Sequence, residues 1–229
     1  DNYLNRCCEN YPTHELGPIA KLLDINRGNR IMTVSSFASK SAGLSEYIKT
    51  RVDATDEMKA ANFAQGDIIT TVLTCARGET ILLRLDTTLP RSYSRDFTVR
   101  GTKGLYMQDT NSVFLDGDEE SFEPVEYYKK ALNNAVKFED EYLPGIWKNV
   151  TEETLKAGHG GMDWFAYMGF TDALINGEEM PVDVYDAATW QAVAVLSEMS
   201  IKQGGAPQIM PDFTNGKWFK RPRKDVCRL

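Results

Sequence analysis

Two runs of β-branched and aliphatic residues lie almost back to back in the first half of the chain. They span Asp67–Cys75 and Glu79–Thr87 and are separated only by Ala76-Arg77-Gly78. A three-residue connection that ends in glycine is typical of a β-hairpin, because glycine readily adopts the backbone conformation of a tight turn. The two runs therefore predict neighbouring antiparallel strands, and the rest of the sheet has to be built around them.

Shorter strand candidates flank this hairpin. A run rich in Ile, Val and Phe precedes it at Arg30–Phe37, and three short runs follow it at Phe97–Arg100, Gly104–Gln108 and Asn111–Leu115. The short connections between the later runs are typical of an antiparallel meander. We expect these strands to form one large, open, mostly antiparallel sheet.

Five segments are helical in apolar spacing or in composition. They are Tyr11–Asp24, Leu44–Val52, Pro124–Tyr142, Gly161–Asn176 and Val184–Gln203. Thr13 is the expected N-cap of the first segment, and Asp183 or Asp186 is the expected N-cap of the last. Helices that are segregated from a run of strands favour an α+β fold, with the helices packed on one face of the sheet.

The chain has 229 residues and shows neither an internal repeat nor a low-complexity linker. This length is sufficient for one sizeable core, so we expect a single domain over residues 1–229. The net charge of -7 opposes broad contact with a phosphate backbone and disfavours nucleic acid as a partner. The basic segment Lys217–Lys224 is an exception, which we interpret as a solvated end.

The four cysteines are too few for a disulfide scaffold and have no C-x-x-C spacing. We expect reduced thiols rather than a zinc site, which favours a cytoplasmic location. No run of about 18 apolar residues occurs, so no membrane span is predicted. The start at Asp1 is neither an initiator methionine nor a signal peptide, and we expect the chain to begin inside a gene or after processing.

The chain contains only two histidines, and both lie in segments rich in glycine, proline or aromatic residues. His14 follows Tyr11-Pro12-Thr13 at the start of a predicted helix. The helix dipole there favours a neutral imidazole, which can act as an acid or base near neutral pH. The alternative is that His14 only completes the start of the helix.

His159 lies in the glycine-rich stretch Gly158-His159-Gly160-Gly161-Met162-Asp163. Glycines let the backbone approach a ligand closely, and Asp163 falls in the first turn of the helix that follows. The alternative is a glycine-rich helix start with a capping carboxylate. Tyr93, which stands between two arginines, is equally open to two interpretations: a residue that faces a polyol, or part of an ordinary rim loop.

Several motifs that would identify a site are absent from the sequence. It has no G-x-G-x-x-G after a strand, no P-loop, no G-x-S-x-G and no H-E-x-x-H. The acidic turn Asp116–Glu120 lacks the ligand spacing of a calcium loop, so no metal site is predicted. The residues alone therefore indicate an α+β domain with a histidine-bearing site and no Rossmann fingerprint.

Five segments resemble one enzyme family, in the same order along the chain. They are Tyr11–Pro18, Pro90–Arg95, Gly158–Asp163, Asp183–Ala188 and Pro211–Thr214. Together they are similar to the NAD-dependent glycosidases of glycoside hydrolase family 109, whose named activity is α-N-acetylgalactosaminidase. That family belongs to the wider Gfo/Idh/MocA oxidoreductases. The resemblance, from Tyr11 to Trp218, implies a substrate-binding C-terminal domain, while the N-terminal Rossmann domain that binds NAD would lie outside this chain.

The resemblance also implies a mechanism and a set of site residues. In the family, NAD transiently oxidises the sugar C3 hydroxyl, which permits elimination of the aglycone and is reversed after water addition. Tyr11 and His14 would be the catalytic residues, and Tyr11 would touch both sugar and nicotinamide. The sugar site would be lined by Tyr11, Pro12, Thr13, His14 and Tyr93, with His159 and Asp163 as further contacts.

The sequence departs from the family pattern at three positions: Glu15 replaces glycine, Ser92 replaces proline and Asn215 replaces arginine. These departures leave the exact sugar open. Two other functions also stay open: a sugar dehydrogenase of the wider superfamily, and an oligomerisation module that packs through its open sheet. We expect a small sugar or glycoside as the ligand. We also expect this chain alone to bind NAD weakly or not at all and to turn over no substrate.

Overall fold

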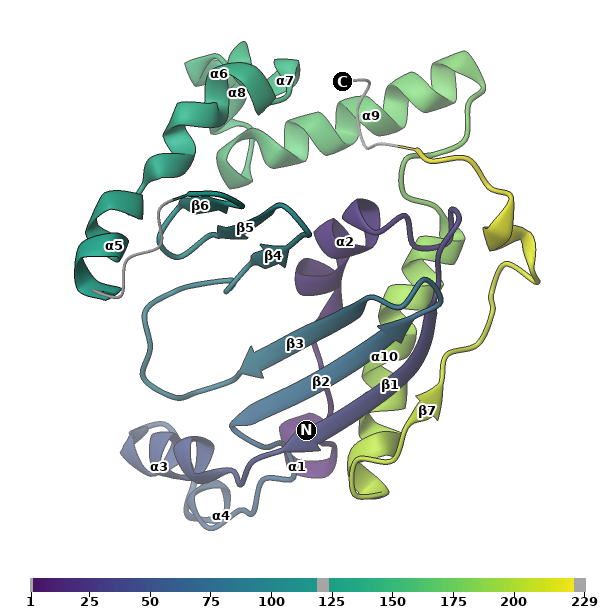
Figure 1. Cartoon of the computed structure of the whole chain (residues 1–229). Coiled ribbons are helices and arrows are strands. Elements are labelled where there is room, and N and C mark those ends of the chain that lie inside the picture. Colours follow the sequence, from purple (N-terminus) through teal and green to yellow (C-terminus); the bar gives the residue numbers. More distant parts are fainter. Residues whose placement is uncertain (1, 119–123, 225–229) are drawn as a thin grey trace. The chain divides into compact units, whose positions relative to one another are not determined.

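The computed structural model describes residues 2–118 and 124–224 (Figure 1). These residues form two compact units. Unit 1 comprises the described residues up to Pro90 and from Gly169 onward, and unit 2 comprises those from Arg91 to Met168. Each unit combines helices with an open antiparallel sheet, which confirms the predicted α+β class.

Unit 1 is built on a four-stranded sheet with the order β3-β2-β1-β7. Its strands are β1 (Ile31–Ala38), β2 (Ile68–Cys75), β3 (Thr80–Asp86) and β7 (Gln208–Ile209). Every neighbouring pair is antiparallel. The predicted hairpin of β2 and β3 is confirmed, with Gly78 at φ +98° in its turn.

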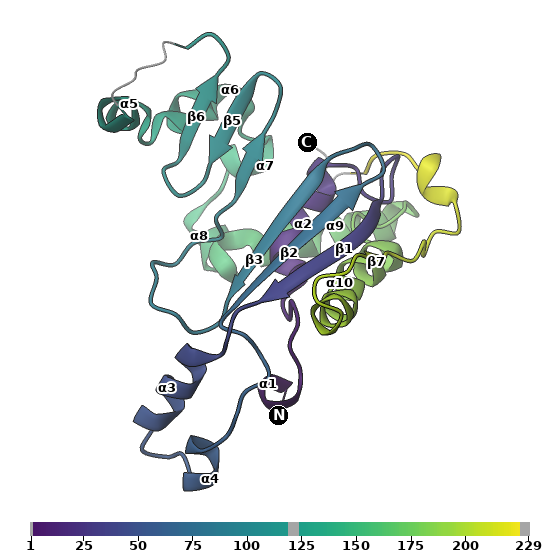
Figure 2. The same ribbon diagram turned by 60° about the horizontal axis from the view of Figure 1, so that its bottom comes forward.

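Two helices, α2 (Pro12–Leu22) and α10 (Val184–Lys202), pack on one face of this sheet and on each other (Figure 2). Successive strand residues point to opposite faces, so alternate residues of β1, β2 and β3 join the helices in the core. The core consists of Leu16, Ala20, Ile25, Ile31, Val34, Leu73, Cys75, Ile81, Leu83, Val193, Leu196 and Met210. Burial of these side chains provides the main driving force for folding of this unit.

The start of α10 follows the sequence prediction. The Asp183 side chain accepts hydrogen bonds from the backbone N–H groups of Tyr185 and Asp186. In return, the Asp186 carboxylate accepts one from the backbone N–H of Asp183 at 3.1 Å. This capping box satisfies donors that have no partner within the helix. Asp183 is therefore the N-cap, and Asp186 completes the motif.

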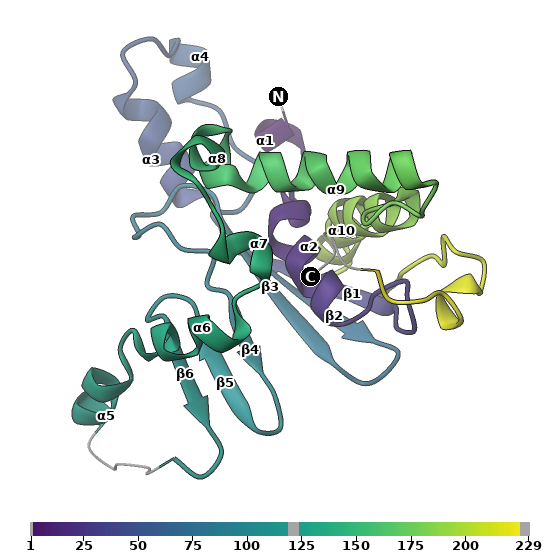
Figure 3. The ribbon, with the colours of Figure 1, turned by 90° about the horizontal axis from the view of Figure 1, so that it is seen from above.

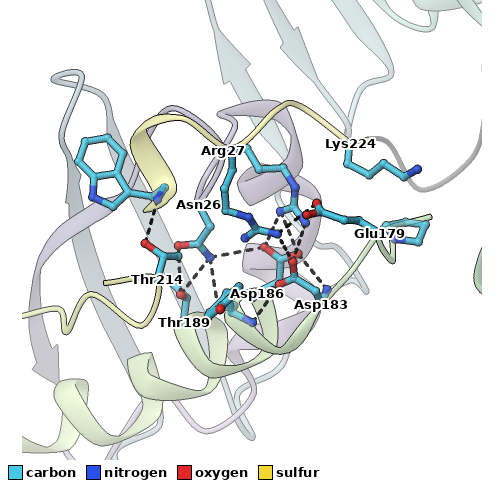
Figure 4. A network of polar contacts seen from close by, with 12 residues as sticks. Asn26, Arg27, Glu179, Asp183, Asp186, Thr189, Thr214 and Lys224 are labelled. Carbon is cyan, nitrogen blue, oxygen red and sulfur yellow. Dashed lines mark hydrogen bonds and ion pairs between the residues drawn. The ribbon is translucent and has the colours of Figure 1, made fainter. Parts of the chain in front are cut away.

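A buried polar network joins the start of α10 to the turn after α2 (Figure 4). The Arg27 guanidinium donates to both oxygens of Asp186 at 2.9 and 3.0 Å and to Asp183 at 3.1 Å. Nearby, Asn26 Nδ2 donates to Thr189 Oγ1 at 3.1 Å. The Arg27 and Asp186 side chains are only 3% and 2% exposed, so water screens this ion pair weakly.

The basic segment Lys217–Lys224 is solvated only in part: Lys217, Lys220 and Arg223 are exposed, as its charge predicted. Arg221, however, pairs with Asp183, and Lys224 Nζ lies 2.8 Å from a Glu178 oxygen (Figure 4 shows this region). The prediction missed these pairs because their carboxylates come from the start of α10 and the segment before it. A charge count along the sequence does not include such distant partners.

The shorter elements of unit 1 are α1 (Asn2–Asn5), α3 (Ala42–Thr50), α4 (Asp56–Lys59) and η3 (Lys217–Phe219), the last a 3₁₀ turn. Helix α3 corresponds to the predicted segment Leu44–Val52, shifted toward the N-terminus. Cys7, Cys8 and Cys75 carry free thiols, and Cys227 lies outside the described residues.

Unit 2 contains a three-stranded antiparallel sheet with the order β4-β5-β6 (Figure 2). Its strands are β4 (Thr98–Arg100), β5 (Gly104–Met107) and β6 (Ser112–Leu115). The predicted meander is confirmed, but the described strands form two sheets instead of the single sheet expected. The reason is that residues 87–97 form no strand, so β4 does not continue the ladder that ends with β3.

The acidic turn after β6 closes on its own backbone. The Asp118 carboxylate accepts a hydrogen bond from the Leu115 backbone N–H at 3.0 Å. Aspartate side chains commonly bond to nearby backbone groups in this way. Glu119 and Glu120, which belong to the same acidic run, lie outside the described residues.

Residues 124–142 form three short helices where one continuous helix was predicted. These are α5 (Pro124–Ala131), η1 (Asn134–Phe138) and α6 (Glu139–Tyr142). Asn133 adopts a left-handed conformation at φ +59°, which cannot continue a right-handed helix. Unit 2 also contains α7 (Gly145–Lys148), α8 (Glu152–Lys156) and η2 (His159–Gly161).

Helix α9 (Met162–Asn176) is continuous and contains the boundary between the units (Figure 3). It ends before Gly177, which has φ +63°, as the sequence predicts. Ala173 is its buried residue, while Phe170 and Leu174 are exposed. Among the described residues, no helix has the length and apolar character needed to cross a membrane.

Candidate functional site

The first candidate residues lie at the start of α2, in unit 1. The Tyr11 ring stacks on the His14 ring with the centroids 4.5 Å apart and the planes at 20°. Tyr11 Oη and His14 Nε2 are 3.3 Å apart, within hydrogen-bonding distance. Tyr11 is 54% exposed and His14 is also exposed, so a ligand can reach both rings from solvent.

The local sequence explains why these rings meet. Pro12 is buried at the first helical position, where its fixed φ suits the helix and its missing N–H costs nothing. Tyr11 is therefore the N-cap, and the prediction of Thr13 as the N-cap is wrong; Thr13 lies half-buried inside the first turn. Positions three residues apart share one side of a helix start, which brings Tyr11 to His14.

The Tyr11–His14 pair has the chemistry to hold a hydroxylated ring and to move a proton. Aromatic faces provide apolar contact area for the flat side of a sugar. The phenol O–H and the imidazole nitrogens each donate or accept hydrogen bonds. Imidazole changes its protonation state near neutral pH, so it can serve as an acid or as a base toward a ligand hydroxyl.

Two carboxyl groups belong to the same end of α2. Glu9 is fully buried, and its Oε1 accepts a hydrogen bond from the Tyr11 backbone N–H at 3.3 Å. Burial, with a smaller contribution from the charge of Glu15, raises the pKa of Glu9 to about 8. Burial also raises the pKa of Glu15 to about 7. Sequence reasoning noted Glu15 only as a departure from a family pattern and missed Glu9.

His159 and Asp163 form a second pair, in unit 2. His159 Nδ1 lies 3.0 and 2.8 Å from the two Asp163 carboxylate oxygens. All four residues from Gly158 to Gly161 have positive φ angles, with His159 at +44°. A side chain at Gly158 would collide with the Asp163 carboxylate. Glycine at this position is therefore required for the backbone to bring the pair together.

Tyr93 lies on the irregular segment that follows β3 and is 85% exposed. Its neighbour Ser94 bonds through Oγ to the Asp109 side chain, and the Asp96 backbone N–H donates to Ser94 Oγ at 2.7 Å. The predicted residues thus fall into three local groups. Tyr11 to His14 meet at the start of α2, His159 and Asp163 meet before α9, and Tyr93 belongs to a loop anchored by Ser94.

The described residues do not match the requirements of a dinucleotide phosphate site. Such a site uses a glycine-rich turn between a strand and a helix of a parallel βαβ unit. Both sheets are antiparallel throughout their described pairs. Within residues 2–118 and 124–224, no cluster of three His, Cys, Asp or Glu side chains is placed to hold a metal ion.

Comparison with known families decides the identity of the chain. Residues 1–220 match the family described as Glycosyl hydrolase 109, C-terminal domain. The chain belongs to glycoside hydrolase family 109. The match confirms the family resemblance that the motifs between Tyr11 and Trp218 indicated. It also shows that the chain corresponds to the C-terminal domain of the family.

Curated relatives align with nearly all of this family 109 chain. A Glycosyl hydrolase family 109 protein from Stenotrophomonas maltophilia is 42% identical over 96% of the chain, and the aligned part is 47% of that protein. An Alpha-N-acetylgalactosaminidase from Tannerella forsythia is 40% identical over 92% of the chain and 43% of its own length. An Alpha-N-acetylgalactosaminidase from Shewanella oneidensis is 34% identical over 91% of the chain and 45% of its own length. The chain therefore spans about half the length of the curated relatives it matches.

Proposed function

We propose that this family 109 chain forms the sugar-binding domain of an NAD-dependent glycosidase that cleaves α-N-acetylgalactosaminide-like glycosides. The observation that carries the proposal is the stacked, solvent-accessible Tyr11–His14 pair at the start of α2. It lies inside the region that matches the family. Two relatives named Alpha-N-acetylgalactosaminidase support the substrate class.

In this proposal, the start of α2 forms one wall of the sugar site. Tyr11 and His14 contact the sugar through their rings and polar edges, half-buried Thr13 adds its hydroxyl, and buried Pro12 shapes the wall through the backbone. His14 moves a proton to or from the sugar, and the nearby Tyr11 hydroxyl holds the imidazole ring in orientation. When bound, NAD would supply the reversible oxidation chemistry for the C3 hydroxyl. The exposed Tyr11 ring is the residue of this chain that would contact the nicotinamide.

Tyr93, His159 and Asp163 are the sugar contacts that we propose within unit 2. Asp163 holds Nδ1 of His159, so the ring is oriented and Nε2 is the nitrogen that meets a ligand hydroxyl. Exposed Tyr93 offers an aromatic face and a hydroxyl. We assign these residues to recognition of sugar hydroxyls, and the proton transfer proposed for His14 is argued from unit 1 alone.

We further propose that residues 1–229 act as one substrate-binding domain joined to an NAD-binding Rossmann domain. The antiparallel sheets and the half-length coverage of the relatives support this arrangement. The chain alone is then expected to bind NAD weakly or not at all and to turn over no substrate. Isothermal titration calorimetry of the chain with NAD tests this expectation, and a micromolar affinity would contradict it.

The glycosidase is tested on the longer protein that carries this chain. It is incubated with a chromogenic α-N-acetylgalactosaminide and NAD, and release of the aglycone and formation of NADH are followed together. A glycosidase returns its hydride in every cycle, so we expect aglycone release without accumulation of NADH. Accumulation of NADH on free sugars without aglycone release would instead indicate a sugar dehydrogenase, and inactivity in both assays would contradict the proposed substrate.

A second proposal concerns the sheet face of unit 1 that α2 and α10 do not cover. Three large apolar side chains are exposed on strands of this sheet: Phe37 on β1, Leu82 on β3 and Ile209 on the edge strand β7. Exposed apolar residues of this kind favour self-association through the open sheet. Light scattering after size-exclusion chromatography tests this proposal. We expect a dimer that Leu82→Arg converts to a monomer, and a strictly monomeric wild-type chain would refute it.

A further inference from the structure

Glu9 connects α10 to the Tyr11–His14 pair. Its backbone N–H donates to Ser197 Oγ on α10 at 2.8 Å, which anchors the residue from one side. On the other side, its Oε1 accepts the Tyr11 backbone N–H at 3.3 Å. The side chain is fully buried, so this connection runs inside the protein, behind the exposed Tyr11 ring.

The surroundings of Glu9 do not suit a negative charge. An ionised carboxylate needs hydrogen-bond donors for both oxygens, yet Glu9 Oε2 is buried without a partner. Glu15, in the first turn of α2, also has a buried oxygen without a partner, and its charge acts on Glu9. The bond from the Tyr11 N–H favours the ionised form of Glu9 but is outweighed by burial and by Glu15.

We propose that Glu9 is a positioning residue for the Tyr11–His14 pair: its protonated carboxyl holds the Tyr11 backbone against α10, and loss of the proton loosens the pair. The inference rests on the proposed function, because it assigns Glu9 to the same sugar site. A neutral carboxyl leaves at most one O–H without a partner, which costs far less than an unpaired buried charge. Once ionised, Glu9 gains hydration only by moving the segment that carries Tyr11.

Two other titratable groups of this region, Glu198 and Cys8, do not reproduce this behaviour. Arg6 and Glu198 of α10 pair at 2.7 Å, and Lys202 binds the other Glu198 oxygen at 2.7 Å, which lowers the pKa of Glu198. Burial raises the pKa of the Cys8 thiol above its ordinary value of 9.0. Burial also raises the pKa of Glu15, in the first turn of α2, to about 7. The signature expected of Glu9, whose pKa burial raises to about 8, is therefore a transition at Tyr11 and His14 that depends on the Glu9 carboxyl itself.

The test uses the ring signals of His14 in this chain, without any turnover assay. The chain has only two histidines, so His159→Gln assigns the two sets of imidazole signals in a carbon–proton NMR spectrum. The pH is then raised from 5 to 9 in the wild-type chain, in Glu9→Gln and in Glu46→Gln. Glu46 is the matched control, because it is an exposed glutamate of unit 1 whose side chain is paired only with Lys49 among the contacts described for it.

We expect the wild-type His14 signal to show an inflection near pH 8. Glu9→Gln should abolish that inflection, since glutamine keeps an acceptor for the Tyr11 N–H but has no proton to lose, and Glu46→Gln should retain it. Glu15→Gln should move it to lower pH by removing a like charge. Absence of the inflection in wild type, or its persistence in Glu9→Gln, would overturn the inference. Neither result depends on glycosidase activity, so the proposed function is judged separately by its own assay.

Discussion

Replacing Arg27 by methionine tests the buried network at the start of α10. The guanidinium makes three hydrogen bonds of 2.9 to 3.1 Å to Asp186 and Asp183, and it is only 3% exposed. Removing one member of a buried ion pair costs about 3–5 kcal/mol, because the remaining charge stays buried without its partner. Asp186 would keep Lys21 Nζ at 3.6 Å and Asn26 Nδ2 at 3.4 Å. These contacts place the expected loss at the lower end, about 3 kcal/mol.

The assay is urea unfolding followed by tryptophan fluorescence. Trp147 and Trp164 of unit 2 are first replaced by phenylalanine, so that Trp190 and Trp218 report on unit 1. With a slope of about 2 kcal/mol per molar urea, the loss corresponds to a midpoint lowered by about 1.5 M.

Arg77→Met is the matched control for Arg27→Met. Arg77 is 52% exposed and lies 3.7 Å from Asp24, and such surface pairs contribute about 0–1 kcal/mol. We expect its urea midpoint to stay close to that of the parent. If Arg27→Met lowered the midpoint no more than Arg77→Met does, the stabilising role assigned to the buried network would be refuted.

Two further predictions concern Glu9 and two glycines. The folded state keeps a proton on Glu9, whose pKa is raised from 4.5 to about 8, whereas the unfolded chain releases it. The free energy of unfolding contributed by this group therefore falls by about 1.4 kcal/mol per pH unit as the pH rises between these two values. Urea midpoints measured at pH 5 and pH 7 should show this fall in the wild type, and Glu9→Gln should lack it. The same change of midpoint with pH in both proteins would refute the assignment. Gly78→Ala should lower the free energy of unfolding by about 1–2 kcal/mol, because alanine at this positive φ is strained. Gly205→Ala has the same strain and also places a methyl group into the Phe37 ring, so its loss of stability should be larger. Equal losses for the two glycines in urea unfolding would contradict the packing described for Gly205.

The hairpin and the start of α10 were predictable because their signals are local. The β2–β3 turn needs a residue with positive φ, and the sequence shows Gly78 directly between two aliphatic runs. The cap of α10 needs a carboxylate before an apolar helix, and Asp183 occupies that position. In both cases, the residues that determine the conformation lie within a few positions of one another.

Other features depend on information that the sequence pattern does not contain. Asn133 interrupts the helix predicted over 124–142, yet an asparagine inside a helix-like composition does not reveal that it adopts φ +59°. The division into two sheets depends on the pairing partners of β3 and β4, which are set by tertiary structure. For the N-cap of α2, a usable signal was present: proline favours the first helical position, which makes Tyr11 the cap.

The candidate site was predicted in part. The motifs drew attention to His14 and His159, and the family resemblance added Tyr11. The stacking of Tyr11 on His14 and the contact of His159 with Asp163 were not predicted, because both depend on the backbone conformation at the helix starts. Glu9 was missed because glutamate side chains are usually exposed. Its burial depends on packing against α10, where its backbone N–H donates to Ser197, and the local sequence does not show this contact.

The central claim, that the Tyr11–His14 pair performs proton transfer on a sugar, is tested most directly by His14→Ala in the longer protein. The measurement is kcat/KM for a chromogenic α-N-acetylgalactosaminide, with the circular dichroism spectrum recorded for both proteins. General acid–base catalysis contributes about 10²–10⁴-fold to a rate. We predict a loss of at least about 100-fold with an unchanged spectrum, and activity close to that of the wild type in the variant would contradict the account.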